Sequence, residues 1–298
     1  MNIRAHAGRR GVILVPYAWL GLFFALPCLI VLKISFAEQL IAQPPYSPLF
    51  TRDADGGLHL ALHLANYRYL VEDALYWRAY LNSVQVAFVS ALLCLLIGYP
   101  MAYAIARARP ARRNLLLMLV VLPFWTSFLL RVYAWMGLLN SQGTVNQLLL
   151  ALGLIEQPLT LLRTNFAVYL GIVYSYLPFM VLPLYANLEK HDHALLEAAA
   201  DLGCPPWRAF LSVTLPLSLP GVLAGSALVF IPALGEFVIP DLLGGSNTLM
   251  IGKVLWDEFF ANRAWPVASA VAIAMLVLVV VLMALQHGLA RRAARATP

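Results

Sequence analysis

Residues 192–216 read DHALLEAAADLGCPPWRAFLSVTLP, and this stretch lies between two long apolar segments. Asp192 can cap a short helix, because its side chain can accept a hydrogen bond from a backbone N–H of the first turn. Gly203, followed by Pro205, predicts the end of that helix. Pro206 can start a second short helix, which we expect to end before Pro216. The pattern therefore predicts a helix–turn–helix at a membrane surface.

The composition places this stretch in a membrane protein. Of the 298 residues, 62% are hydrophobic and 11% are charged, against about 25% charged in soluble domains. A soluble chain of this length cannot bury so much apolar surface. The composition excludes a disordered chain and an ordinary cytosolic enzyme, and it favours an all-α polytopic membrane protein.

A transmembrane helix needs about 20 mostly apolar residues. Six segments meet this requirement, at about 12–35, 80–106, 114–138, 165–188, 217–240 and 265–288. We expect the first to be an uncleaved anchor, because its apolar run exceeds the ~7–15 residues of a signal peptide. One transmembrane domain, 12–288, then lies between the terminal tails 1–11 and 289–298.

The positions of lysine and arginine predict the orientation of the spans. Twelve of these 20 residues fall in the two tails and in the loops 107–113 and 189–216, six fall in the other loops, and Lys33 and Arg131 lie within spans. Because cytoplasmic loops carry the excess of basic residues, we expect both termini to be cytoplasmic and the long loop 36–79 to be external. Topology then explains the net charge of +6, and we expect no nucleic-acid partner.

Sequence motifs of enzymes are missing. The chain has no GxxxxGK[ST] and no GxSxG, and its three cysteines form no CxxC. Since a phosphate-binding loop needs that glycine and lysine spacing, we expect no ATP hydrolysis by this chain, no catalytic residue and no metal site.

The loop 192–216 has a more specific spacing. Glu197-Ala198-Ala199 is followed by three residues, Gly203, nine residues and Val213-Thr214-Leu215-Pro216. This pattern resembles the EAA loop of binding-protein-dependent ABC importer permeases, with Val213 in place of the usual isoleucine. The resemblance implies the type I ABC importer permease fold, in a bacterial inner membrane. It also implies that the loop couples to an ATPase through Glu197, Ala198, Ala199, Asp201, Gly203, Leu215 and Pro216.

Three further stretches narrow the resemblance. Residues 122–137, 229–245 and 250–260 look like the permeases of polyamine importers, first the putrescine type and then the spermidine/putrescine type. The resemblance implies a second homologous permease, an ATPase homodimer that holds ATP and magnesium, and an extracytoplasmic polyamine-binding protein, all assembled on the lipid bilayer. The chain itself is then expected to bind no cofactor.

Glu236 is the acid of greatest interest, because it lies in an apolar segment interrupted by glycine and proline. An ionisable residue at membrane depth is a functional candidate, and carboxylates and aromatic faces are what an alkylammonium ion needs. Glu236 can also form an ion pair with Arg131 that holds helices together. The candidates along the substrate path are Glu236, Asp241, Arg131, Trp125, Tyr133, Trp135, Tyr174 and Tyr176.

Other functions stay open on the sequence alone. The same class of permease carries other small solutes, among them thiamine, ferric iron and sulfate. An ion-coupled secondary transporter that uses Glu236 as its ion site is a further alternative, although the EAA spacing disfavours it. An intramembrane enzyme lacks any motif.

Overall fold

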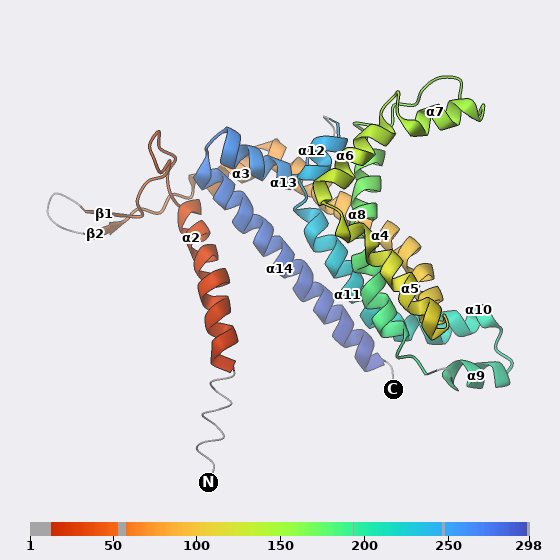
Figure 1. Cartoon of the computed structure of the whole chain (residues 1–298). Helices are drawn as coiled ribbons and strands as arrows, with labels where there is room; N and C mark the ends of the chain where they lie inside the picture. The colour runs from red at the N-terminus through yellow and green to blue at the C-terminus, as the bar shows by residue number, and fades with distance from the viewer. Residues whose placement is uncertain (1–12, 53–57, 193, 246–247, 297–298) are drawn as a thin grey trace, which may run out of the picture. The chain divides into compact units, whose positions relative to one another are not determined.

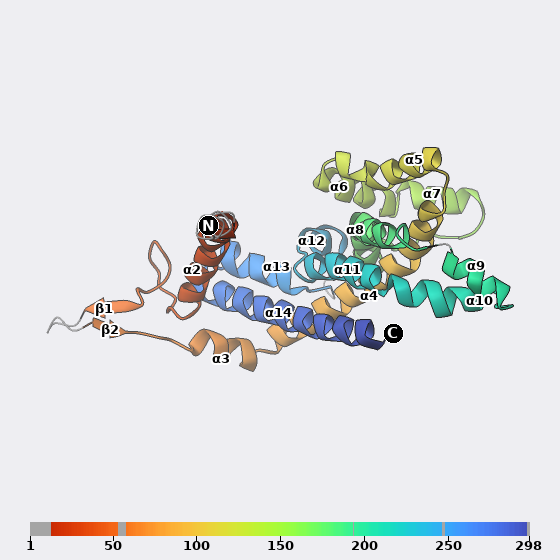
Figure 2. The ribbon, with the colours of Figure 1, turned by 90° about the horizontal axis from the view of Figure 1, so that it is seen from below.

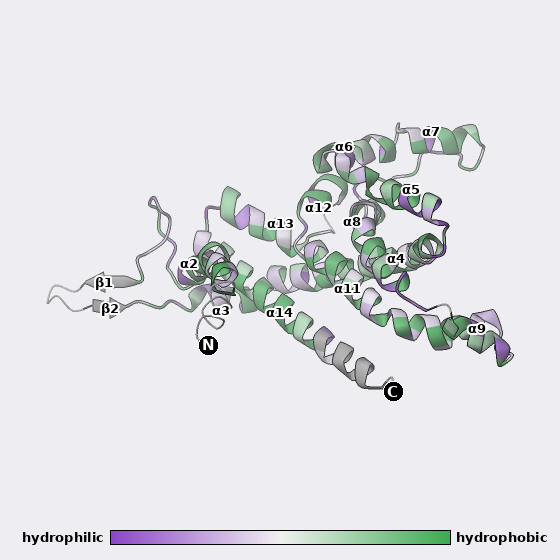
Figure 3. Cartoon of the chain, turned by 60° about the horizontal axis from the view of Figure 1, so that its bottom comes forward, coloured by the Kyte–Doolittle hydropathy of each residue, from purple (hydrophilic) through white to green (hydrophobic). Residues whose placement is uncertain are grey.

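The computed structural model describes residues 13–52, 58–192, 194–245 and 248–296 (Figure 1). Among these residues, five helices are long and apolar enough to cross a membrane, and a bent pair of helices makes up to six. The five are Ile13–Ser35, Ala74–Ala106, Asn165–Leu188, Pro206–Leu234 and Trp265–Gln286. Figure 3 shows the hydrophobic colour dominating these helices. The all-α class is confirmed, with one small antiparallel hairpin added to it.

The chain divides into two compact units. The first comprises residues 1–77 with 255–278, and the second comprises 78–254 with 279–298. Helices α4 (Ala74–Ala106), α13 (Ile251–Trp256) and α14 (Trp265–Ala296) run through both ranges.

The first unit holds the first span and the long loop that follows it. Its elements are η1 (Gly21–Ala25), α2 (Leu26–Ser35), β1 (Phe50–Arg52), β2 (Leu58–Leu60), α3 (Ala65–Glu72) and η4 (Asp257–Ala261). Asn66 ties α3 to the end of α2, because its side-chain amide donates to the carbonyl oxygens of Ser35 and Ala37 at 2.9 and 2.8 Å. The loop 36–79 is therefore ordered against its own span where these contacts form.

The second unit is built on two long helices, α8 (Asn165–Leu188) and α11 (Leu215–Leu234), which pack on each other. Gly225 of α11 makes this close approach possible, since a Cβ there would lie 2.8 Å from the sulfur of Met180. Met180, Leu184 and Val229 are fully buried between the helices. The unit also contains α5 (Pro110–Val121), η2 (Leu122–Trp125), α6 (Phe128–Leu139), α7 (Thr144–Ala151), α9 (Ala194–Asp201), α10 (Pro206–Ala209), η3 (Phe210–Thr214) and α12 (Val238–Leu243).

The third predicted span is not one straight helix. The helical stretches Pro110–Trp125 and Phe128–Ala151 meet at 88°. Thr126 and Ser127 are the cause, because both have extended backbone, with ψ of 151° and 138°. Pro123 lies just before them and has no N–H to continue the helical hydrogen bonds. The predicted segment 114–138 therefore has its break near its middle.

The fifth span also differs from its predicted bounds. The helix that Pro206 starts does not end before Pro216, but continues through the π-helical turn η3 to Leu234. Pro216 lies just after this π-helical turn, where the regular α-helical hydrogen-bond pattern is already interrupted. At the other end, Gly235 terminates α11, so Glu236 lies in a break between two helices and not within a continuous span.

Candidate functional site

The loop 192–216 forms the predicted helix–turn–helix, with α9 and α10 side by side (Figure 2). The side chain of Asp192 accepts a hydrogen bond from the Ala194 N–H at 3.0 Å, so the predicted cap is confirmed. At the other end, Gly203 has a φ of +75°. The Gly203 N–H donates to the Ala200 carbonyl and the Cys204 N–H to the Ala199 carbonyl, at 2.8 and 2.9 Å. These two bonds define a Schellman motif, in which glycine is preferred because it alone adopts this φ without strain.

The residues of this loop are available to a partner. No residue of α9 is buried, and Glu197, Ala198 and Asp201 are all exposed. Leu202 is 88% exposed and Trp207 is 60% exposed. Leu215 and Pro216, by contrast, are half-buried in the first turn of α11. The structure thus separates the predicted coupling residues into an exposed group at 197–203 and a pair at the root of the fifth span.

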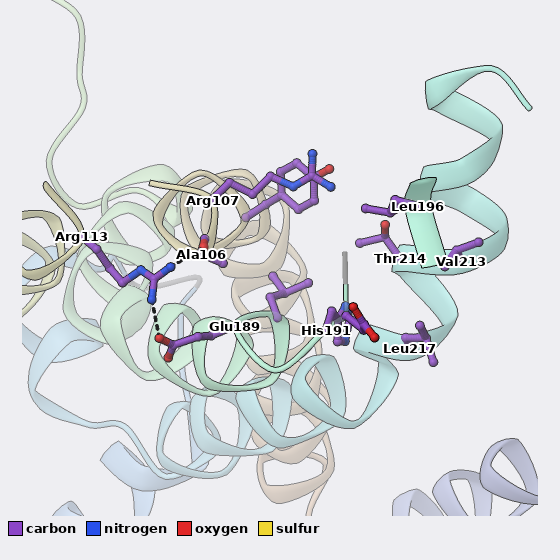
Figure 4. Close-up of a pocket in the computed structure, with 12 residues that line it drawn as sticks. Ala106, Arg107, Arg113, Glu189, His191, Leu196, Val213, Thr214 and Leu217 are labelled. Carbon is purple, nitrogen blue, oxygen red and sulfur yellow. Dashed lines mark hydrogen bonds and ion pairs between the residues drawn. The ribbon is translucent and has the colours of Figure 1, made fainter. Parts of the chain in front are cut away.

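The base of the loop is held by an arginine, Arg113, whose position in the sequence indicated only the orientation of the spans. Arg113 donates to the Glu189 carboxylate at 2.5 Å and to the Ala106 carbonyl at 3.0 Å (Figure 4). It therefore links the end of α4, the start of α5 and the end of α8. The adjoining cavity is small, about 60 Å³, and its lining includes His191 and Leu196 at the start of the loop. In the sequence, this contact was indicated only by the acidic residue Glu189, three residues before the loop begins at Asp192.

A larger cavity, of about 540 Å³, lies among α6, α8 and the break after α11. Its lining residues are Phe124, Phe128, Arg131, Ser175, Tyr176, Phe179, Pro232, Gly235, Glu236, Phe237 and Val238. Glu236 is only 7% exposed. Its carboxylate accepts hydrogen bonds from the Tyr176 hydroxyl at 2.5 Å and from the backbone N–H groups of Val238 and Ile239 at 3.1 and 3.4 Å. These donors hold the carboxylate in one orientation at the cavity wall.

Arg131 lies in the same cavity but does not pair with Glu236 in the described structure. Its guanidinium carbon lies 5.3 Å from the ring centre of Phe124 and 5.8 Å from that of Phe128. The Nε and Nη1 atoms are buried and find no acceptor among the described residues. The guanidinium is therefore stabilised by aromatic faces.

The other predicted residues along the substrate path are dispersed. Asp241 forms an ion pair with Lys253 at 3.0 Å, and Trp135 packs edge-on against Tyr174, with ring centres 5.4 Å apart. Trp125 and Tyr133 lie on exposed surface, 78% and 53% exposed. Of the predicted aromatic residues, the structure brings Tyr176 to Glu236.

Four phenylalanines of the cavity were missed from the sequence, namely Phe124, Phe128, Phe179 and Phe237. Phe124 and Phe128 flank the bend at Thr126 and Ser127, so a straight helix through 114–138 would have placed them differently. Phe237 directly follows Glu236, and that adjacency was the available signal.

Comparison with known proteins identifies the class. A model of the family described as "Binding-protein-dependent transport system inner membrane component" matches residues 94–295. The chain belongs to this family. It is a multi-pass protein of the inner membrane, and it has the permease role that the EAA spacing predicted.

Individual relatives refine the place of this permease in the family. It is 41% identical over 283 residues to the spermidine/putrescine transport system permease protein PotB of Haemophilus influenzae, a match that covers 95% of this chain and 94% of the relative. PotB of Escherichia coli is 40% identical over 266 residues, covering 89% and 92%. The predicted resemblance to permeases of polyamine importers is confirmed.

Solved structures show the fold. A bacterial ABC transporter that imports alginate contains a chain that superposes with a TM-score of 0.72, at 18% identity, over 98% of this permease and 97% of that chain. A chain of the methionine transporter MetNI gives a TM-score of 0.56 at 17% identity, over 74% and 96%. The expected type I ABC importer permease fold is thereby confirmed.

Proposed function

We propose that this permease is a non-catalytic subunit of an ATP-driven polyamine importer and forms half of its translocation path. The observation that carries the proposal is the buried carboxylate of Glu236 in a cavity lined by five aromatic rings. The names of its relatives, spermidine/putrescine permeases at about 40% identity, point to the same cargo.

The cavity suits a cationic amine. An ammonium group is attracted to a carboxylate and to the faces of aromatic rings, and the aliphatic carbons between ammonium groups need apolar walls. Tyr176 and Phe179 continue the aromatic wall from Glu236, with ring centres 6.1 Å apart, and Phe124 packs on Phe179 at 5.2 Å. An ammonium group at Glu236 would therefore leave the carbon chain against rings.

The exposed loop at 194–203 is the proposed contact with an ATPase. Leu202 in this loop and Trp207 in the following helix α10 present exposed apolar surface, and Glu197 and Asp201 are exposed acids of the loop. This combination favours a protein partner over water. In this proposal a homodimeric ATPase binds ATP and magnesium, a second homologous permease completes the path, and an extracytoplasmic binding protein delivers the polyamine. Both termini and the loop 192–216 then face the cytoplasm.

Replacement of Glu236 by glutamine tests the cargo site. We expect Glu236→Gln to lower polyamine uptake in the reconstituted transporter at least about ten-fold, because a charged hydrogen-bond partner contributes roughly 1.5–3 kcal/mol. Glu156→Gln is the matched control, since Glu156 is exposed in the loop after α7. Copurification of the ATPase measures assembly. Wild-type uptake by an assembled Glu236→Gln transporter would contradict the proposal.

A permease for an oxyanion is the second candidate, and Arg131 is the observation that favours it. Arg131 lines the cavity and has no carboxylate partner among the described residues, and guanidinium binds oxyanions well. A molybdenum transport permease of Mycobacterium bovis is also 34% identical over 206 residues. Uptake assays with molybdate and sulfate beside putrescine and spermidine distinguish the two cargoes.

A further inference from the structure

Two opposite charges line one cavity without meeting. The oxygens of Glu236 are engaged by Tyr176 and by two backbone N–H groups. The guanidinium of Arg131 lies instead on the rings of Phe124 and Phe128. The cavity thus already contains a cation on part of its aromatic wall.

That position matters because a ring face accommodates one cation at a time. An incoming ammonium group at Phe124 or Phe128 would meet the guanidinium, and like charges at such short range repel each other. We propose that Arg131 is a tethered cation that occupies these two ring faces in the empty cavity and is displaced when an amine binds. The inference rests on the proposed polyamine function.

The contacts of Arg131 allow its displacement at a moderate cost in free energy. Its Nε and Nη1 atoms find no acceptor in the described part of the chain, and buried N–H groups without acceptors are unfavourable. Arg131 also lies in the first turn of α6, directly after the extended residues Thr126 and Ser127. A long side chain at this position can turn away without unwinding a helix.

The expected consequence is a weakened membrane site. Part of the binding free energy of an amine is lost in removing the guanidinium, so the affinity of the cavity is lower than its aromatic residues alone would give. A low affinity favours release of cargo to the cytoplasm after delivery by a binding protein. Arg131 therefore sets the affinity of the cavity for amines, and it is not a partner that holds Glu236.

The test measures equilibrium binding of radiolabelled putrescine and spermidine to the purified transporter complex without its binding protein. Two neutral variants, Arg131→Gln and Arg131→Met, are compared with Arg131→Lys and the wild type. We expect both neutral variants to bind at least one polyamine about ten-fold more tightly, which corresponds to about 1.4 kcal/mol. The lysine variant, which keeps the charge, should bind like the wild type.

Several results would overturn the inference. Assembled neutral variants that bind no more tightly than the wild type would show that the guanidinium does not compete. If Arg131→Lys binds polyamines as tightly as the neutral variants do, the positive charge does not determine the affinity. If Arg131→Lys assembles into the complex and neither neutral variant does, the positive charge is needed for folding, and its role is structural. The Glu236→Gln uptake assay separates these results from failure of the proposed function, because that assay does not depend on Arg131.

Discussion

Gly203 shows how one residue positions the proposed coupling surface. Its φ of +75° is a conformation that costs a residue with a Cβ about 1–2 kcal/mol. A Cβ there would meet no atom within 4 Å, so backbone conformation and not crowding requires the glycine. The exposed group at 197–203 is thus set by the turn that follows it.

We predict that Gly203→Ala destabilises the end of α9 and reduces the stimulation of ATPase activity by loaded binding protein about two- to ten-fold. The measurement is ATP hydrolysis by the reconstituted complex. Gly153→Ala is the matched control, because Gly153 also has a positive φ, +67°, and nothing within 4 Å, but lies after α7. Equal loss of stimulation in the two variants would show that the effect is not specific to the loop.

At the scale of elements, the ion pair of Arg113 with Glu189 joins α5 to the end of α8 at the base of the loop (Figure 4). The two side chains are 25% and 40% exposed, so the pair itself contributes no more than about 1 kcal/mol to stability. Its position directly before the loop gives it a larger expected influence on coupling than on folding.

We therefore predict that Arg113→Gln and Glu189→Gln each lower the rate of transport, while the unfolding temperature of each variant stays close to that of the wild type. A double-mutant cycle measures the interaction: if the pair acts as a unit, the double variant should lose about as much transport as either single variant. Losses that simply add would contradict the proposed link. Lys190→Gln, a change at a neighbouring exposed residue, is the control.

The elements also show what could be predicted from the sequence. Local signals were sufficient for α9, because Asp192 and Gly203 act through backbone atoms a few residues away. They were insufficient for the bend at Thr126 and Ser127, where one proline indicated a weak point but not an angle of 88°.

The cavity was predictable only in part. Glu236 was recognisable as an acid in an apolar segment, and Tyr176 was named as a candidate. Their contact at 2.5 Å joins residues 60 positions apart. The contacts between α6 and α8 also join residues far apart in the sequence. Hydrophobic periodicity predicts elements but does not say which faces of distant helices meet, so the phenylalanines of the cavity were missed.

At the scale of the whole molecule, apolar surface remains exposed in the isolated chain. The window of the first span Ile13–Ser35 has a mean hydropathy of 2.1 and is 0% buried. In a bilayer, lipid tails or a partner chain would cover these side chains. This exposure agrees with a subunit that functions inside a membrane complex, as the family assignment requires.

The central claim is that the chain carries polyamines with energy from a partner ATPase. The direct measurement is uptake of radiolabelled putrescine and spermidine into proteoliposomes that contain this permease, its second permease and the ATPase, with the binding protein added outside. We predict uptake that requires ATP inside the vesicles and the binding protein outside, and that is unaffected when ion gradients are dissipated. Uptake driven by an ion gradient without the ATPase, or ATP-dependent uptake of an oxyanion in place of polyamines, would contradict the account.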